Sequence, residues 1–265
     1  MEEQALYVRD GDAFVGTILT QGGWDPAGAN GGTVLALLGH CLDEVPSLVP
    51  MGVSRFTADL VRPVPLGRRL HVTSTVLREG KKIQLVQLVL TADDVEHVRA
   101  TALRVRTADV SDAAVPPSTS DARPADLVAP PEEAISFRRD DPAAPGFLRA
   151  LDMRRAEGRD GSGPGVWVRL EVPVVAGEPT NPTAQLTVGI DYVNLIGLDV
   201  QSTGLIMINP DVTAQVLRPP TGEWIVVTGD SRTNPAMGRG ISYGLLSDGD
   251  GVFATASTSQ LIQPR

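Results

Sequence analysis

The spacing of apolar residues divides the chain into helical and strand-like stretches. Residues 33 to 42 carry apolar side chains on every side of a helix, which predicts a helix enclosed by the rest of the protein. Asn30, Gly31 and Gly32 precede this stretch, and Asn30 can cap its start. The first half of the chain is therefore expected to hold one buried helix, entered through a glycine-containing turn.

A two-residue period replaces the helical one between Arg55 and Thr107, where apolar and polar residues alternate in several runs. The segment Glu79-Gly80-Lys81-Lys82 is typical of a turn between two such runs. We therefore expect several antiparallel strands after the first helix.

The second half of the chain shows a similar pattern. Residues 166 to 172 alternate as a half-buried strand does, and Asn181-Pro182 can open a second apolar helix that extends to Ile196. Strand-like runs follow at residues 211 to 217, 224 to 229, 240 to 246 and 252 to 262. Each half is thus predicted to contain a helix followed by strands.

One short motif occurs in both halves of the chain. A Thr-Ala pair precedes an Arg-Pro pair at Thr57 and Arg62, and again at Thr213 and Arg218, 156 residues later. Solenoid repeats recur every 20 to 50 residues or so, which excludes them here. We interpret the repeat as a duplicated domain, with residues 1–108 as the N-terminal copy, 109–131 as a Pro/Ala-rich linker and 132–265 as the C-terminal copy.

Composition narrows the function classes. The net charge of −9, without a lysine- or arginine-rich run, disfavours nucleic acid or an anionic membrane as the main partner. The longest apolar runs are shorter than the roughly 20 residues that a membrane helix needs. A signal-peptide pattern is missing, and Cys41, the single cysteine, cannot form an internal disulfide. We expect a soluble, cytoplasmic protein.

Four short segments resemble a known family. They are Asn30-Gly31-Gly32, Ile190-Asp191-Tyr192-Val193-Asn194-Leu195, Asp211 with Arg218-Pro219-Pro220 and Glu223-Trp224, and Gly238-Arg239-Gly240 with Asp248-Gly249 and the run Ala256-Ser257-Thr258-Ser259-Gln260. In order and spacing they resemble the type II acyl-CoA thioesterases, which have two fused hot-dog domains. The resemblance implies an α+β fold of two tandem hot-dog modules, each an apolar helix wrapped by an antiparallel sheet. It also implies an acyl-CoA substrate and a homo-oligomer.

Asp191 is the first candidate catalytic residue. Burying an unpaired carboxylate within an apolar helix is costly, so its presence there needs a reason. The resemblance implies that this aspartate orients and deprotonates an attacking water. The alternative is a structural aspartate that is paired or faces solvent.

Gln260 is the second candidate, because it shares one face of the last expected strand with Ala256 and Thr258. The family has a matching glutamine that acts on the same water, whereas an edge-strand glutamine in solvent is the alternative. The third family position is a threonine, and this chain has Asn209 there, counted back from Asp211. Asparagine still donates and accepts hydrogen bonds, but it lacks a hydroxyl's geometry; Thr213 is an alternative if it faces the same cavity.

Further residues are predicted to bind the substrate. Unpaired N–H groups at a helix start stabilise an oxyanion, so Asn30, Gly31 and Gly32 are candidates; a turn that serves only helix entry is the alternative. Arg239 is the candidate for the phosphates of coenzyme A. Because Arg62 and Arg218 match each other in the repeat, we expect these two to share a structural role.

The sequence contains no motif that indicates a serine-hydrolase triad or a metal site. His40, His71 and His97 are isolated, a Gly-x-Ser-x-Gly motif is missing, and no Cys/His spacing indicates a metal. We therefore predict an acyl-CoA thioesterase, a hydrolase without metal or cofactor, in which coenzyme A enters only as part of the substrate. The alternatives are a catalytically weak acyl-CoA-binding protein, a hot-dog hydratase or dehydratase for which no histidine is well placed, and an interaction module without a ligand.

Overall fold

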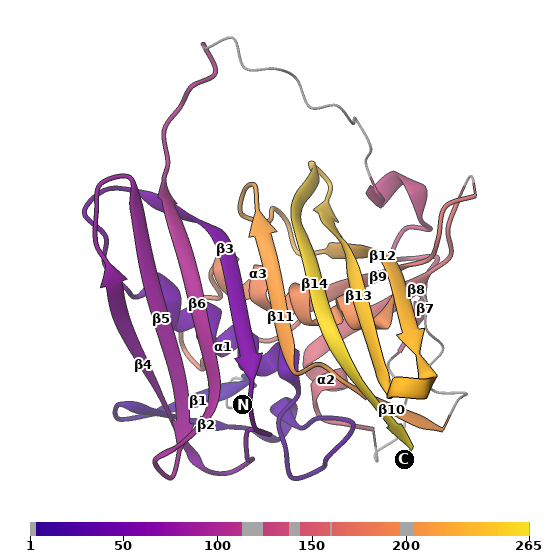
Figure 1. Cartoon of the computed structure of the whole chain (residues 1–265), viewed down its shortest axis with the longest axis horizontal. Coiled ribbons are helices and arrows are strands. Elements are labelled where there is room, and N and C mark those ends of the chain that lie inside the picture. Colours follow the sequence, from indigo (N-terminus) through magenta and orange to yellow (C-terminus); the bar gives the residue numbers. More distant parts are fainter. Residues whose placement is uncertain (1–3, 113–123, 138–143, 160, 197–203, 265) are drawn as a thin grey trace.

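The computed structural model describes residues 4–112, 124–137, 144–159, 161–196 and 204–264. A single long antiparallel sheet curves around two central helices, α1 and α3 (Figure 1). The helices are α1 (Gly31–Asp43), α2 (Phe147–Ala150) and α3 (Pro182–Asp191), and the short 3-10 turns are η1 (Ile18–Thr20), η2 (Pro124–Leu127), η3 (Tyr192–Leu195) and η5 (Pro235–Met237).

The strands of the first half are β1 (Tyr7–Asp10), β2 (Ala13–Gly16), β3 (Met51–Leu60), β4 (Arg69–Arg78), β5 (Ile83–Ala92) and β6 (Val95–Arg106). Those of the second half are β7 (Ile135–Ser136), β8 (Leu151–Ala156), β9 (Gly165–Leu170), β10 (Leu205–Ile208), β11 (Asp211–Val216), β12 (Ile225–Asn234), β13 (Arg239–Asp248) and β14 (Gly251–Pro264). Their order across the sheet is β1-β2-β4-β5-β6-β3-β11-β14-β13-β12-β9-β8-β7, and β10 pairs with β14 off this path.

The two repeats meet along their matching motifs. Strands β3 and β11 pair antiparallel at the middle of the sheet, and Thr57 lies directly opposite Thr213. These are the two threonines of the repeated Thr-Ala pairs. The approximate twofold relation between the halves therefore passes between Thr57 and Thr213, and the two sheets join into one without a break.

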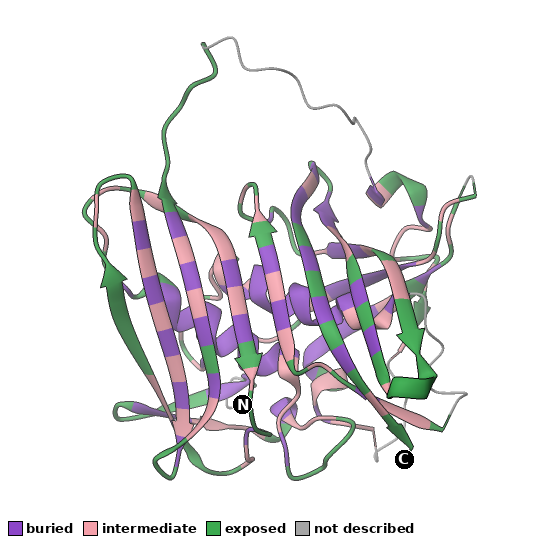
Figure 2. Cartoon of the chain, in the orientation of Figure 1, coloured by how far each residue is buried: buried purple, intermediate pink, exposed green. Residues whose placement is uncertain are grey.

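The helices form the centre of the core because they have no polar face. Residues 32 to 42 of α1 are all buried, and α1 packs against α3 on the concave side of the sheet (Figures 1 and 2). Gly39 permits the close approach, since a Cβ there would lie 2.3 Å from Thr187 Oγ1 and 2.8 Å from the Thr183 carbonyl oxygen. The buried helices with an antiparallel sheet around them confirm the predicted α+β architecture.

Some details differ from the sequence expectation. The second α-helix ends at Asp191 and continues as η3, not as an α-helix to Ile196. Strands that the sequence did not predict also precede the helices: β1 and β2 come before α1, and β7 and β8 before α3, whereas β9 is the strand expected at residues 166 to 172. These short strands lie towards the ends of the sheet, where tertiary pairing decides their conformation more than their own alternation does. Within the expected linker, Val128 is buried and packs with Trp167.

Candidate active site

Asp191 lies where the end of α3 meets the start of α1. Its side chain is buried, and the backbone N–H of Gly32 donates a hydrogen bond to the carboxylate. A Cβ on Gly31 would lie 2.8 Å from Asp191 Oδ1, so only glycine lets the helix start approach this closely. The positive end of the α1 dipole thus faces a carboxylate.

The environment of Asp191 raises the pKa of its carboxyl group towards neutral pH. Burial raises the pKa of Asp191 from its ordinary 3.8 to about 6, while hydrogen bonds from Asn209 and from the Gly32 N–H partly oppose the rise. A carboxylate with this pKa is ionised at pH 7 and still basic enough to accept a proton, as a general base must be.

Asn30 holds this junction together. Its Oδ1 accepts a hydrogen bond from the backbone N–H of Thr33 at 3.3 Å, which makes it the N-cap of α1 as predicted. The same oxygen accepts from Tyr192 Oη at 2.9 Å. Tyr192 was not among the sequence candidates, although a buried tyrosine usually needs a partner for its hydroxyl.

Asn209 follows β10 and contacts Asp191 directly. Its Nδ2 donates to Asp191 Oδ1 and to the Asp191 carbonyl oxygen, both at 3.2 Å. Asn209 Oδ1 is buried and has no hydrogen-bond partner among the described residues. The side chain therefore supports the carboxylate with its nitrogen and presents an unused acceptor.

Gln260 lies on β14 beside this segment. The last residue pair between β10 and β14 is Ile208 with Leu261, and these two residues directly adjoin Asn209 and Gln260 in the sequence. Gln260 is buried, its Nε2 donates to Ser242 Oγ at 2.9 Å, and its Oε1 has no partner among the described residues. Two amide oxygens without donors thus come from neighbouring backbone positions.

Other sequence candidates lie elsewhere. Arg239 is exposed at the start of β13, and its neighbour Gly240 is the residue that faces Gln260. Because side chains alternate along a strand, Arg239 points from the opposite face of the sheet. On β11, Val212 and Ala214 are the buried residues, so Thr213 is on the other face and does not substitute for Asn209.

Arg62 and Arg218, the arginines of the repeated Arg-Pro pairs, each contact a backbone carbonyl near the start of the last strand of their own repeat. Arg62 Nη1 donates to the carbonyl oxygen of Glu96 at 2.8 Å, and Arg218 Nη2 donates to that of Gly251 at 3.0 Å. Arg218 also forms a bidentate pair with Asp248, at 2.6 and 2.7 Å. Both arginines therefore tie their strands to the following β-hairpin of the same repeat.

A group of charged residues around His40 lies at the end of α1, away from Asp191. His40 follows the α1 cap Asn30 by ten residues, as Asp191 follows the α3 cap Asn181. His40 Nε2 lies 2.9 Å from Glu178, and Arg9 bridges Glu178 and Glu44 at 2.7 and 2.8 Å. His40, Glu44 and Glu178 are close enough to share a cation, but the Arg9 guanidinium already supplies a positive charge to both carboxylates. We interpret the cluster as an ion-pair network.

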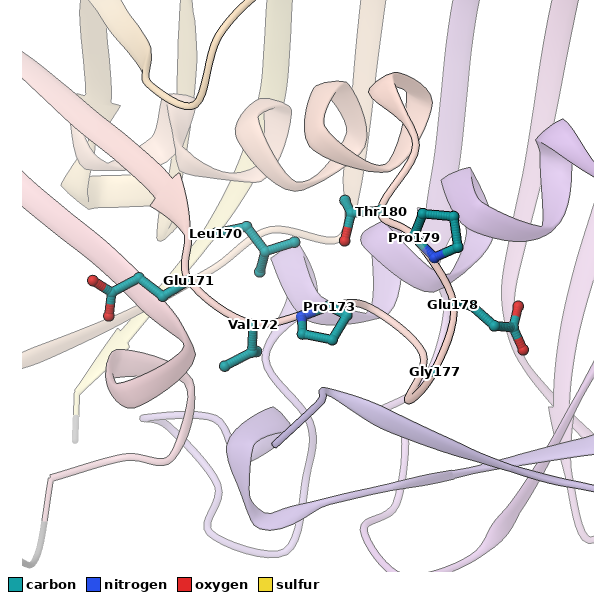
Figure 3. A pocket seen from close by; sticks show the side chains of 8 residues that line it. All are labelled: Leu170, Glu171, Val172, Pro173, Gly177, Glu178, Pro179 and Thr180. Atoms are coloured by element: carbon teal, nitrogen blue, oxygen red, sulfur yellow. The ribbon is translucent and has the colours of Figure 1, made fainter. Parts of the chain in front are cut away.

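A cavity of about 410 Å³ lies at this end too (Figure 3). It is lined by Leu170, Glu171, Val172, Pro173, Gly177, Glu178, Pro179 and Thr180. These residues lead into the start of α3, whereas Asp191 is at the end of that helix, about 14 Å away at the rise of an α-helix. The cavity is separate from the cluster around Asp191.

The fold is that of the hot-dog proteins. In structure the chain is similar to an acyl-CoA thioesterase II, TesB2, from Mycobacterium marinum, with a TM-score of 0.66, 15% sequence identity and coverage of 97% of this chain and 94% of that one. It is also similar to a conserved hot-dog protein from Alicyclobacillus acidocaldarius, with a TM-score of 0.67, 16% identity and coverage of 98% and 96%. A candidate thioesterase from Novosphingobium aromaticivorans has a TM-score of 0.72 at 22% identity, with coverage of 97% and 98%.

Sequence models of two domains then identify the family. The model of the acyl-CoA thioesterase N-terminal domain matches residues 20–105, and that of the C-terminal domain matches residues 110–262. The chain belongs to the acyl-CoA thioesterase family, whose members are enzymes that hydrolyse thioesters. No curated protein sequence is significantly similar to it. Within the described ranges, each helix is too short or too polar to cross a membrane.

Proposed function

We propose that this protein hydrolyses acyl-CoA thioesters by direct attack of one water held by Asp191, Asn209 and Gln260. The observation that carries this proposal is the buried Asp191 carboxylate at the start of α1, with a pKa of about 6 and a contact to Asn209. The unpartnered oxygens of Asn209 and Gln260 support it, because a buried acceptor without a donor is unfavourable and a water supplies two donors.

The reaction needs one proton acceptor and no covalent intermediate. Asp191 takes a proton from the water while the water oxygen bonds to the thioester carbonyl carbon, which leaves a tetrahedral oxyanion. The oxyanion then collapses, the C–S bond breaks, and coenzyme A leaves as a thiolate. A thiolate is a good leaving group, so a strong general acid is not required.

The start of α1 supplies a donor for the oxyanion. The N–H of Gly32 is directed to Asp191 and that of Thr33 to Asn30 Oδ1. The N–H of Gly31 is then the one at this helix start with no partner among the described residues. We assign it to the developing oxyanion, where a preorganised N–H contributes most.

Further parts of the proposal concern the whole protein. We place the two domains at residues 1–108 and 132–265, with 109–131 between them, and we assign no metal or cofactor to the reaction. The exposed side chains of Ile241, Tyr243 and Leu261 on β13 and β14 support a homo-oligomer, because they leave apolar area on the outer face of the sheet. Cys41 is free and buried, which suits the cytoplasm. Arg239 is retained as a proposed phosphate contact, reachable only from that outer face.

The competing functions are separated by turnover. Purified protein is incubated with short, medium, long and aromatic acyl-CoAs, and the released thiol is measured with a colorimetric thiol reagent. We expect turnover of at least one ester by the wild type and a loss of about 10²- to 10⁴-fold in Asp191→Ala. Equal rates for the two proteins would instead indicate an acyl-CoA-binding protein.

A hydratase is disfavoured by the position of the histidines. His40 is at the opposite end of α1 from Gly32, and it contacts Glu178 and not Asp191. An enoyl-CoA added to the protein is expected to keep its conjugated absorbance. Loss of that absorbance would support hydration over hydrolysis.

A further inference from the structure

Gln260 is connected to the end of η3 by a chain of hydroxyl groups. Gln260 Nε2 lies 2.9 Å from Ser242 Oγ, and Ser242 Oγ lies 2.6 Å from Ser231 Oγ. Ser231 Oγ in turn lies 2.6 Å from the carbonyl oxygen of Ile196. The two serines face each other across β12 and β13.

The direction of every hydrogen in this chain follows from its last member. A backbone carbonyl can only accept, so Ser231 donates to the Ile196 carbonyl oxygen. A serine hydroxyl has a single hydrogen, so Ser231 must accept from Ser242. Ser242 has then used its own hydrogen and can only accept from Gln260, which must present its NH₂ group.

The opposite orientation of the amide is unfavourable. With Oε1 towards Ser242, the hydroxyl of Ser242 would turn to Gln260, and the single hydrogen of Ser231 could serve only one of its two contacts at 2.6 Å, to Ser242 or to the Ile196 carbonyl oxygen. The remaining pair of oxygens would be in contact without a hydrogen between them, and such oxygens repel each other. The number of available hydrogens therefore decides which way the Gln260 amide is oriented, with its NH₂ group towards Ser242.

This arrangement directs the amide oxygen to the remaining side of Gln260. The oxygen lies over Gly240, the residue that pairs with Gln260 on β13, and a Cβ at that glycine would be 2.4 Å from Oε1. The oxygen is buried and has no donor among the described residues. It is consequently a hydrogen-bond acceptor in a fixed position, to which a bound molecule can donate.

The same series of hydrogen bonds also links Gln260 to Asp191 through the turn η3. Turn η3 begins directly after Asp191 and ends directly before Ile196. Asn209 holds the first end of this turn through Asp191, and Ser231 holds the second through the Ile196 carbonyl. Asp191 and the Gln260 amide are thus both anchored to a single turn of helix.

We propose that Ser231 and Ser242 are positioning residues that hold Gln260 with Oε1 towards the attacking water, so that Gln260 accepts one hydrogen of this water. This inference rests on the proposed thioester hydrolysis. With one hydrogen donated to Gln260 and the other directed to the base, a lone pair of the water oxygen is left for the carbonyl carbon.

The experiment compares four single serine variants and one double variant by their kinetics on the acyl-CoA that the wild type hydrolyses fastest. Ser242→Ala and Ser231→Ala remove members of the chain, and Ser231→Thr keeps the hydroxyl at a half-buried strand position. Ser247→Ala is the matched control, because Ser247 is a fully buried serine on the same β13 whose hydroxyl has no partner among the described residues.

We expect Ser242→Ala and Ser231→Ala to lower kcat by about 5- to 100-fold with KM nearly unchanged, because the amide acts on the water and not on the acyl group. Ser231→Thr should retain most of kcat, and Ser247→Ala should behave like the wild type. Because the serines act through one chain, the double alanine variant should lose no more than the worse single one. Thermal unfolding verifies that each variant is folded, and Ser231→Ala carries the test should Ser242→Ala not fold.

The outcomes distinguish this inference from the proposed function. If Asp191→Ala is inactive but both serine-to-alanine variants keep kcat within twofold of Ser247→Ala, the positioning role is overturned and the hydrolase remains. A drop in kcat that Ser231→Thr does not rescue would also overturn it, since the hydroxyl is then not the group that matters. If Asp191→Ala is as active as the wild type, the proposed function fails first.

Discussion

The side-chain nitrogen of Asn209 lies 3.2 Å from Asp191 Oδ1, and this hydrogen bond joins the segment after β10 to the end of α3. It opposes the effect of burial on the carboxylate, as the Gly32 N–H also does. No cation is paired with Asp191 among the described residues, so its pKa is set by burial, which raises it, and by these two donors, which lower it. The pH dependence of the protein should report on them.

The rate of hydrolysis should follow the ionisation of Asp191. Only the carboxylate form can accept a proton, so kcat should rise about tenfold per pH unit below pH 6 and level off above it, near the pKa of about 6. The measurement is kcat at saturating acyl-CoA from pH 4.5 to 8, corrected for spontaneous hydrolysis. A profile that stays flat across this range would exclude Asp191 as the base.

Stability should change with pH in the opposite direction. The folded pKa of Asp191 is raised from 3.8 to about 6, so the native state holds its proton more tightly than the unfolded state. The stabilisation is complete below pH 3.8 and is lost as the pH rises through about 6. The difference amounts to roughly 3 kcal/mol, at about 1.4 kcal/mol per pKa unit.

This loss is measured by urea unfolding of the wild type against Asp191→Asn. Other titrating groups are common to both proteins and cancel in the difference. The free energy of unfolding of the wild type, relative to the variant, should fall between pH 4 and pH 7. A constant difference would show that the carboxyl titrates alike in the folded and unfolded states.

Removing the Asn209 amide should shift the pH profile. Asn209→Ala takes away a donor that lowers the pKa of Asp191, so the midpoint of the rate profile should move above about 6. Asn209→Thr keeps a donor at this position and should have a midpoint closer to that of the wild type. An unchanged midpoint in Asn209→Ala would mean that this hydrogen bond does not control the base.

Gly31 is expected to tolerate no side chain without loss of activity. In Gly31→Ala the new Cβ would lie 2.8 Å from Asp191 Oδ1 and 3.0 Å from Oδ2, so the carboxylate must move. We expect kcat to fall by about 100-fold, as small displacements of a catalytic group do. Alanine favours a helix over glycine by about 1 kcal/mol, so folding should survive. Gly163→Ala, where a Cβ meets nothing within 4 Å, is the control.

The repeated arginines should differ in their effect on stability. Burial alone would raise the pKa of Asp248, but Arg218 and two backbone N–H groups hold it below its usual range. Arg218→Ala would leave this buried carboxylate without its cation and should destabilise the fold by about 3 kcal/mol. Arg62→Ala, which loses a hydrogen bond at the surface, should cost less than about 1 kcal/mol. Equal effects in urea unfolding would contradict this assignment.

Much of the architecture could be predicted because it is encoded locally. The apolar helix after Asn30, the alternating strands and the repeated Thr-Ala and Arg-Pro pairs depend on residues close together in the chain. The end of the second helix at Asp191 could not be placed in this way, because the apolar pattern continues through η3. Tertiary contacts on that turn decide between the α and 3-10 conformations.

The residues around Asp191 were only partly foreseeable. A carboxylate in an apolar segment is conspicuous in a sequence, because burying a charge is costly. Ser231, Ser242 and Tyr192 carry no such signal, since isolated serines and tyrosines are common in strands and helices. They gain significance only from the atoms that they contact.

The periodicity of apolar residues along the chain therefore predicts two modules, their central helices and most of their long strands, and the cost of burying a charge singles out Asp191. The spatial arrangement of the cluster has another origin, because its hydrogen bonds join distant parts of the chain: Asn30 and Tyr192, for instance, are 162 residues apart. Such contacts form only when α1 and α3 pack side by side and β3 pairs with β11 at Thr57 and Thr213. Hydrophobic burial drives that packing without regard to individual hydrogen bonds, so a local pattern does not reveal which polar groups it brings together.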